Sequence, residues 1–180
     1  MKRYLCLLRG INVSGKNMIR MPDLVGSLIR SGFSEVQSYI QSGNILFCHD
    51  EESTAELSRE IERLIIRDFG FNVPAQVLTP EELWAVVNDN PFINKGSADI
   101  EKLHITFLSG NPDERLVEKL LSFSFPPDEI LISGKAAYLH CPEGYGRTKY
   151  NNTFIEKKLG VQATTRNWRT CLTLFEMLSK

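Results

Sequence analysis

The chain has 180 residues, of which 42% are hydrophobic, and its net charge at pH 7 is −1. This length can supply the core of one large domain or two small ones. The apolar stretch at residues 4–8 is short and has arginines close on both sides, and no other apolar run is long enough to span a membrane. We therefore expect a soluble globular protein without a secretory signal or a membrane span.

Apolar periodicity in the first half predicts the order strand, helix, strand, strand, helix, strand. Pro22 suits the first turn of the first helix, Gly32 suits its end, and Ser53 with Glu56 forms a capping box before the second helix. The expected elements are a strand at residues 4–8, a helix at 22–30, strands at 36–40 and 45–48, a helix opened by Ser53 and ending before Gly70, and a strand at 73–78. This order, β-α-β-β-α-β, is the ferredoxin-like unit.

The second half repeats this order after a connecting helix, which Thr79 and Glu82 cap, and a polar linker at residues 88–100. The expected elements are a strand at residues 103–108, a helix at 112–123, strands at 129–132 and 136–140, a helix at 148–159, an edge strand at 161–163 and a last helix at 168–178. Local matches such as "YIQSGNILF" with "ILISGKAAYLH" also indicate a tandem repeat.

The sequence therefore predicts an α+β fold of two tandem ferredoxin-like subdomains with an additional C-terminal helix. We expect the first subdomain at residues 1–79, the connecting helix and linker at 80–100, and the second subdomain with the C-terminal helix at 101–180.

Four cysteines lie far apart, in or beside apolar segments, and none has the spacing of a redox pair. They are Cys6, Cys48, Cys141 and Cys171. Because disulfides are rare in reducing compartments, the pattern predicts reduced core thiols in a cytoplasmic protein. We predict no metal site.

The sequence of the loop "GINVSGKN" nearly matches the phosphate-binding loop of nucleotide hydrolases. However, Asn17 stands where that loop has its magnesium-binding hydroxyl, Pro22 fits a helix start, and the order β-α-β-β lacks the parallel crossover such enzymes need. The loop can still bind an anion through its amides and Lys16, with Arg9, Asn12 and Asn17 beside it. The alternative is a plain connection with a solvated lysine.

The turn "QSGN" supplies two further candidate ligand-binding residues, Gln41 and Ser42. Its other two residues, Gly43 and Asn44, are explained by turn chemistry alone.

Charge is distributed unevenly along the chain. Residues 1–22 carry five basic and no acidic side chains, residues 144–180 carry seven basic and two acidic ones, and the part between carries nine basic and twenty acidic ones. The two ends therefore either pair with the acidic middle in the fold or form an anion-binding surface where they meet.

Cations flank two predicted helix starts near the C-terminus, although a helix N-terminus already carries partial positive charge. Arg147 and Lys149 flank the first start, and Arg166 and Arg169 flank the second. Either acidic side chains or a bound phosphate, carboxylate or nucleic-acid backbone must offset these charges.

Residues around the second start have roles with or without a ligand. Thr165 and Asn167 can cap the helix. Trp168 is expected in the core, because it shares an apolar stripe with Leu172 and Phe175.

No motif places a nucleophile beside a base, so the sequence identifies no catalytic residue and leaves open both the cofactor and whether the protein is an enzyme. The histidines His49, His104 and His140 each lie in or beside a predicted strand.

Four motifs, "LLRGINVSGKN", "YIQSGNILF", "GYGRTK" and "ATTRNWRT", occur in this order over the whole chain. Together they closely resemble a bacterial family known as domain of unknown function 1697. The resemblance implies a small cytosolic α+β protein of two subdomains and brings no reaction, cofactor or catalytic residue. The chain has Ser14-Gly15-Lys16 where the family commonly has glycine-glycine-lysine.

Three functional hypotheses follow. The first is a binding module for an anionic ligand, either a phosphorylated small molecule or nucleic acid. Its site would be a basic cluster made by the loop at residues 9–17 together with Arg147, Lys149, Arg166 and Asn167. The second is an enzyme acting on a small phosphorylated or nucleotide-like substrate at the same residues. The third is a protein-interaction or regulatory module in which the motifs are structural, so a protein partner stays open.

Overall fold

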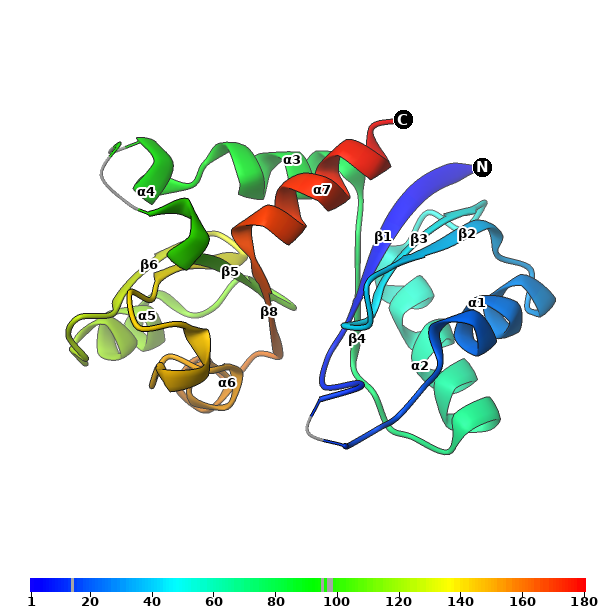
Figure 1. Cartoon of the computed structure of the whole chain (residues 1–180), viewed down its shortest axis with the longest axis horizontal. Coiled ribbons are helices and arrows are strands. Elements are labelled where there is room, and N and C mark those ends of the chain that lie inside the picture. Colours follow the sequence, from blue (N-terminus) through cyan, green and yellow to red (C-terminus); the bar gives the residue numbers. More distant parts are fainter. Residues whose placement is uncertain (14, 95, 97–98) are drawn as a thin grey trace. The chain divides into compact units, whose positions relative to one another are not determined.

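The computed structural model describes residues 1–13, 15–94, 96 and 99–180, and the other four positions include Ser14 of the loop and part of the predicted linker. The chain folds into two compact units, each with a four-stranded antiparallel sheet and helices on it (Figure 1). The first unit comprises Met1–Trp84 together with Leu174–Lys180, and the second comprises Ala85–Thr173. The predicted α+β fold of two tandem ferredoxin-like units with a C-terminal helix is confirmed.

The first unit has the strand order β2-β3-β1-β4, so β1 lies inside the sheet with a partner on each edge. Its elements are β1 (Lys2–Leu8), α1 (Met21–Arg30), β2 (Ser34–Tyr39), β3 (Asn44–His49), α2 (Thr54–Phe69) and β4 (Ala75–Leu78). The Ser53 hydroxyl accepts a hydrogen bond from the Glu56 amide before α2, and Gly70 ends that helix with φ 74°. Both predicted ends of α2 are confirmed.

The core of the first unit lies between one face of its sheet and the two helices α1 and α2. Alternate residues of a strand share a face, so Tyr4, Cys6 and Leu8 of β1 all enter this core. They meet the apolar stripes of α1 and α2, which include Leu28 and Ile61.

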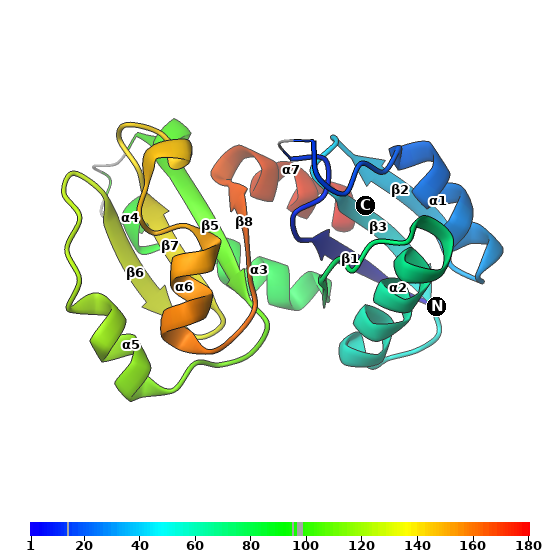
Figure 2. The same cartoon turned by 90° about the horizontal axis from the view of Figure 1, so that it is seen from below.

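The second unit repeats the arrangement, with strand order β6-β7-β5-β8 and β5 inside the sheet (Figure 2). The division between the units falls within α3 and again within α7. The elements of this half are α3 (Pro80–Asn88), α4 (Pro91–Asn94), η1 (Ile100–Lys102), β5 (Leu103–Leu108), α5 (Glu114–Leu121), β6 (Glu129–Ser133), β7 (Ala136–His140), η2 (Tyr145–Arg147), α6 (Asn152–Leu159), β8 (Ala163–Asn167) and α7 (Trp168–Leu178).

Two predicted boundaries are wrong by four residues, and several others differ by one or two. Helix α6 begins at Asn152 and not at residue 148, because the Asn151 side chain caps it by accepting from the Phe154 amide at 2.9 Å. Strand β8 runs from Ala163 to Asn167, further than the predicted edge strand, because all of it pairs with β5. Trp168 is buried, as its apolar stripe predicted.

Gly43 is required in the first unit by both backbone conformation and space. Its φ is 76°, and its carbonyl accepts a hydrogen bond from the Leu8 amide at 2.8 Å. A Cβ at this position would lie 2.7 Å from Leu8 Cβ and 2.8 Å from Ile11 Cδ1.

The variant Gly43→Ala therefore tests the close approach between this turn and β1. Left-handed backbone costs a non-glycine residue about 1 kcal/mol, and the overlap with β1 adds about 1 to 3 kcal/mol. Urea unfolding measures the loss. The matched control is Gly70→Ala, with φ 74° and no atom within 4 Å of the added Cβ, which loses only the conformational part. Equal losses in the two variants would contradict the packing argument.

Candidate functional site

Two asparagine side chains hold the loop between β1 and α1 in shape. Asn12 Nδ2 donates to the carbonyls of Ile19 and Gln41, both at 2.9 Å, and Asn12 Oδ1 accepts from the Ile19 amide at 2.8 Å. Asn17 Nδ2 donates to the Gly10 carbonyl at 3.0 Å. Both asparagines have left-handed backbone, with φ 53° and 46°, which asparagine tolerates better than most residues. These two candidate residues therefore use their amides to build the loop.

The turn between β2 and β3 is braced in a similar way. The buried Asn44 Nδ2 donates to the Tyr39 carbonyl and to Ser42 Oγ, both at 3.0 Å. Gln41 contributes its carbonyl to Asn12, while its side chain is exposed. Loop and turn are thus tied together at Asn12.

The cations of this loop differ in exposure. Lys16 is exposed and forms no ion pair within the described part of the chain. Arg9 is half-buried, and its backbone amide donates to the Pro74 carbonyl at 2.9 Å. Of the six candidate residues in this unit, Lys16 and the Gln41 side chain are the most accessible to a ligand.

In the second unit, the register between β5 and β8 separates the candidate residues onto two faces of the sheet. Thr165 pairs with Thr106, and Asn167 pairs with His104. Arg166 lies between them in sequence and pairs with Ile105, so its side chain points to the other face. The three neighbouring candidates therefore do not form one cluster.

Thr165 is the centre of a hydrogen-bond network on the face covered by α6. Its hydroxyl donates to Asn152 Oδ1 at 2.7 Å and accepts from the Tyr145 hydroxyl at 3.0 Å. The Thr106 hydroxyl lies 2.7 Å away and must be the donor, because the single Thr165 proton is already committed. The network connects β5, β8, η2 and α6.

His104 lies on the same face, beside this network. Its ring stacks on Tyr145 with 5.1 Å between the ring centroids and an interplanar angle of 28°. Its Nδ1 lies 3.2 Å from the Lys102 carbonyl, so Nδ1 carries the proton and Nε2 is the basic nitrogen of the neutral ring. Burial lowers the pKa of His104, and the hydrogen bond to the Lys102 carbonyl opposes part of that shift.

Arg166 is buried on the opposite face, with 7% of its surface exposed. Its Nη1 donates to the Thr164 hydroxyl at 2.9 Å and to the Thr165 carbonyl at 2.8 Å. Burial raises the pKa of the nearby Cys171 to about 12, and the charge of Arg166 opposes that rise. The guanidinium therefore supports β8 and the start of α7.

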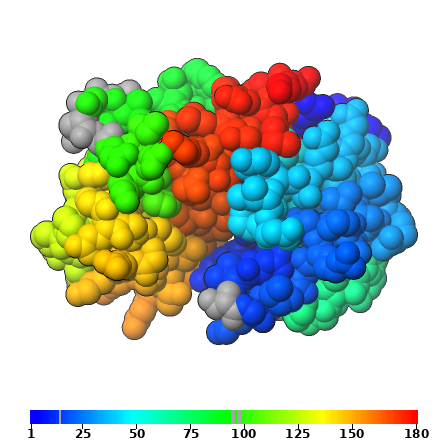
Figure 3. Space-filling view, viewed as in Figure 1, coloured from blue at the N-terminus to red at the C-terminus, as the bar shows by residue number. Residues whose placement is uncertain are grey.

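The three other cations near the predicted helix starts, Arg147, Lys149 and Arg169, are exposed. Arg169 forms an ion pair with Glu101, so for this residue the acidic middle of the chain does supply the partner. Lys149 Nζ lies over the ring of Phe125 at 5.2 Å from its centroid. Arg147 ends the short helix η2 and has no ion pair within the described residues. The segment around it lies on the surface (yellow-orange in Figure 3).

Four residues of this face were not among the predicted site residues, namely His104, Thr106, Tyr145 and Asn152. The two-residue period of β5 would have placed His104 and Thr106 on one face. Their proximity to Thr165 depends on pairing between strands some sixty positions apart, as in the Thr106–Thr165 contact with a separation of 59 residues.

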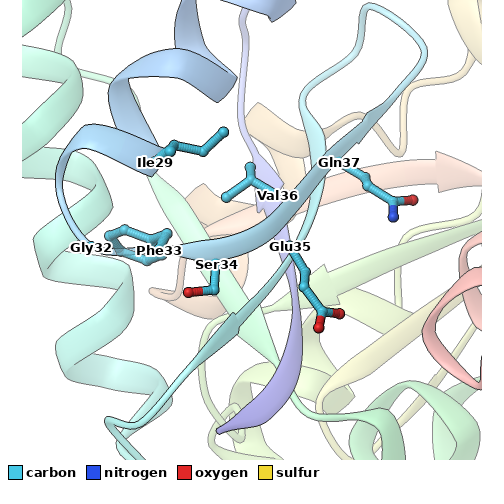
Figure 4. Close-up of a pocket in the computed structure, with 7 residues that line it drawn as sticks. All are labelled: Ile29, Gly32, Phe33, Ser34, Glu35, Val36 and Gln37. Carbon is cyan, nitrogen blue, oxygen red and sulfur yellow. The ribbon is translucent and has the colours of Figure 1, made fainter.

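A separate open hollow lies on the first unit, where the end of α1 meets the edge strand β2. Ile29, Phe33 and Val36 give it apolar walls, and Glu35 and Gln37 give it polar ones (Figure 4). None of the predicted site residues lines it.

Two features are absent from the described part of the chain. No group of three or more histidine, cysteine, aspartate or glutamate side chains there could hold a metal ion. Among the same residues, no helix combines the length and the apolar character needed to cross a membrane.

The fold and these sites define a two-unit ferredoxin-like α+β protein. A family model described as a protein of unknown function, DUF1697, matches residues 1–138, and the chain belongs to this family. The structure is similar to that of the conserved bacterial protein SP0830 from Streptococcus pneumoniae, with 27% sequence identity and a TM-score of 0.78. That similarity covers 100% of this chain and 99% of the other. No curated protein sequence matches the chain.

The variant Asn12→Asp tests the structural role of this candidate residue. A carboxylate would remove two donors and face the carbonyls of Ile19 and Gln41, so we expect a loss of about 2 kcal/mol or more in unfolding free energy. Asn111→Asp, at an exposed position before α5, is the control and should change stability by less than about 0.5 kcal/mol. A fully stable Asn12→Asp protein would show that the amide is not needed for the loop.

The pKa of His104 can be measured by NMR titration of its ring protons, with His104→Gln for assignment. Because burial disfavours the charged ring, we expect the midpoint below the ordinary value of 6.5. The unfolded chain then takes up the proton at a higher pH than the folded one. His104 therefore lowers stability as the pH falls below about 6.5 and has no effect well above it. A midpoint above 6.5 would contradict this assignment.

Proposed function

We propose that this protein is a binding module for an anionic ligand, and that the ligand is a phosphorylated small molecule bound by the second unit at Arg147. The observation that carries the proposal is the exposed Arg147 guanidinium, which lacks an acidic partner in the described part of the chain. Arg169, also exposed, has such a partner in Glu101. A cation left unpaired in a segment that leads to a helix start is suited to a bound anion.

Neighbouring groups support the same location. Asn152 is the first residue of α6, and its Oδ1 is engaged by Thr165, which leaves its side-chain N–H groups to donate. Lys149 adds a second positive charge in the segment before the helix. Bidentate donation from an arginine together with amide donors is the usual means of recognising a phosphate group.

A thermal-shift panel tests the proposal, with inorganic phosphate, pyrophosphate, nucleoside monophosphates and a short single-stranded RNA as probes. A ligand present at about 100 times its dissociation constant stabilises the folded protein by roughly 2.7 kcal/mol. We expect stabilisation by at least one small phosphorylated probe. Stabilisation by RNA alone, falling steeply with added salt, would indicate nucleic acid as the ligand instead.

The variant Arg147→Ala should weaken the binding of that probe by about tenfold or more, because one charge-assisted contact contributes about 1.5 to 3 kcal/mol. Arg115→Ala, which removes an equally exposed arginine from α5 of the same unit, is the control and should bind normally. Equal effects of the two variants, or no stabilisation by any probe, would contradict the proposed site.

An enzyme acting on a phosphorylated or nucleotide-like substrate is the second candidate. The observation in its favour is His104, whose neutral ring has its Nε2 lone pair beside the polar face that holds Tyr145 and Thr165. A group of this kind can serve as a general base. Loss of turnover in His104→Gln with unchanged ligand affinity would favour this candidate over a binding module.

The proposal also covers the cellular compartment, the source and the evolutionary origin of the protein. Its four cysteines are free and buried, which supports a reducing cytoplasmic compartment. The similarity to a bacterial protein supports a bacterial origin. The shared strand order of the two sheets supports an origin by duplication of one ferredoxin-like unit.

A further inference from the structure

Strand β6 forms an open edge of the second sheet. It pairs with β7 alone, and all five of its residues stay in one continuous register from Glu129 to Ser133. No other hydrogen bond to its backbone occurs within the described part of the chain. A regular edge strand presents a row of N–H and C=O groups that can pair with another strand.

The corresponding edge of the first unit, strand β2, is protected. Its register with β3 shifts between Ser34 and Gln37. Glu35 lies in that irregularity with a left-handed φ of 50° (Figure 4). Its carboxylate forms an ion pair with Arg3. Bulges and charged side chains are the usual protection of a sheet edge against pairing with another chain. Strand β6 has no such bulge.

The three central side chains of β6 are apolar, whereas a protected edge strand usually carries charged side chains there. Ile130, Leu131 and Ile132 are consecutive, and each is only half-buried. Ile130 and Ile132 pack partly against the core under α5 and α6. Leu131 points to the other face of the sheet. Pairing with another strand would cover the exposed parts of all three side chains.

The sequence of β6 is complementary to itself in antiparallel orientation. With Leu131 opposite Leu131 of a second copy, Ile130 lies opposite Ile132, and Glu129 lies opposite Ser133. The acidic Asp128 and Glu129 at one end of the strand then approach the turn Gly134-Lys135 of the second copy, which carries no acidic residue. No like charges face each other, and such cross-strand pairs determine which register is stable.

We propose that two copies of this chain associate through antiparallel pairing of their β6 strands, centred on Leu131. The two four-stranded sheets of the second units then form one continuous sheet of eight strands. Such an interface is isologous, since the same surface of each copy contacts the other.

Sedimentation equilibrium of the full chain, from about 1 µM to about 100 µM, tests this proposal over the range typical of weak homodimers. We expect a reversible monomer–dimer equilibrium. In Leu131→Lys two ammonium groups would meet at the two-fold axis, so the dimer should weaken by at least tenfold. Gln37→Lys places the same charge on the exposed edge strand of the first unit and should leave the dimer unchanged.

Two variants at the exposed Ser133 test the register without touching the core. Ser133→Glu would face Glu129 of the second copy and should weaken the dimer, whereas Ser133→Lys would face the same Glu129 and should strengthen it. A protein that stays monomeric at about 100 µM would overturn the proposal. So would a dimer that responds equally to Ser133→Glu and Ser133→Lys, or one that Gln37→Lys disrupts.

Discussion

Strand β5 has a hydrogen-bonded partner on each edge, and its pairing with β8 positions the polar side chains that these two strands contribute to the second unit. Pairing with β8 brings Thr106 to Thr165 and His104 to Asn167. Since successive side chains of a strand alternate between faces, the same pairing sends Arg166 to the opposite side. The hydroxyl network under α6 and the buried guanidinium near α7 are therefore two results of one register. A shift of β8 by one residue would exchange the two faces and remove both.

The predicted site residues divide into those that build the fold and those that stay accessible. Asn12, Asn17 and Thr165 commit their side chains to hydrogen bonds inside the protein, and Arg166 is buried. Lys16, Arg147 and Lys149 remain exposed. Fully satisfied polar networks make a scaffold rigid, so the backbone that carries the exposed cations is already ordered before an anion binds. The polar motifs thus have a structural use whether or not the cations hold a ligand.

The sequence was sufficient for most of the architecture, because the signals for its elements are local. The capping box at Ser53 and Glu56, the terminal glycine of α2 and the limits of β5, β7 and α7 depend on nearby residues alone. The start of α6 was misplaced because Thr148 and Asn151 are both suitable caps, and the side-chain bond from Asn151 decides between them. The site could not be predicted in the same way. Its groups meet through strand pairs distant in sequence, and neighbours in the chain such as Thr165 and Arg166 lie on opposite faces of the sheet.

The irregular edge of β2 limits how far copies of this chain could assemble. Two different regular edges on one molecule would allow head-to-tail pairing, which adds a copy at each step and yields filaments. Because its register with β3 shifts and Glu35 has a left-handed backbone, β2 does not present a regular edge for pairing with another strand. Association through β6 then covers the β6 edge of both molecules in a single contact. Growth by these two strands then stops at a closed pair of molecules.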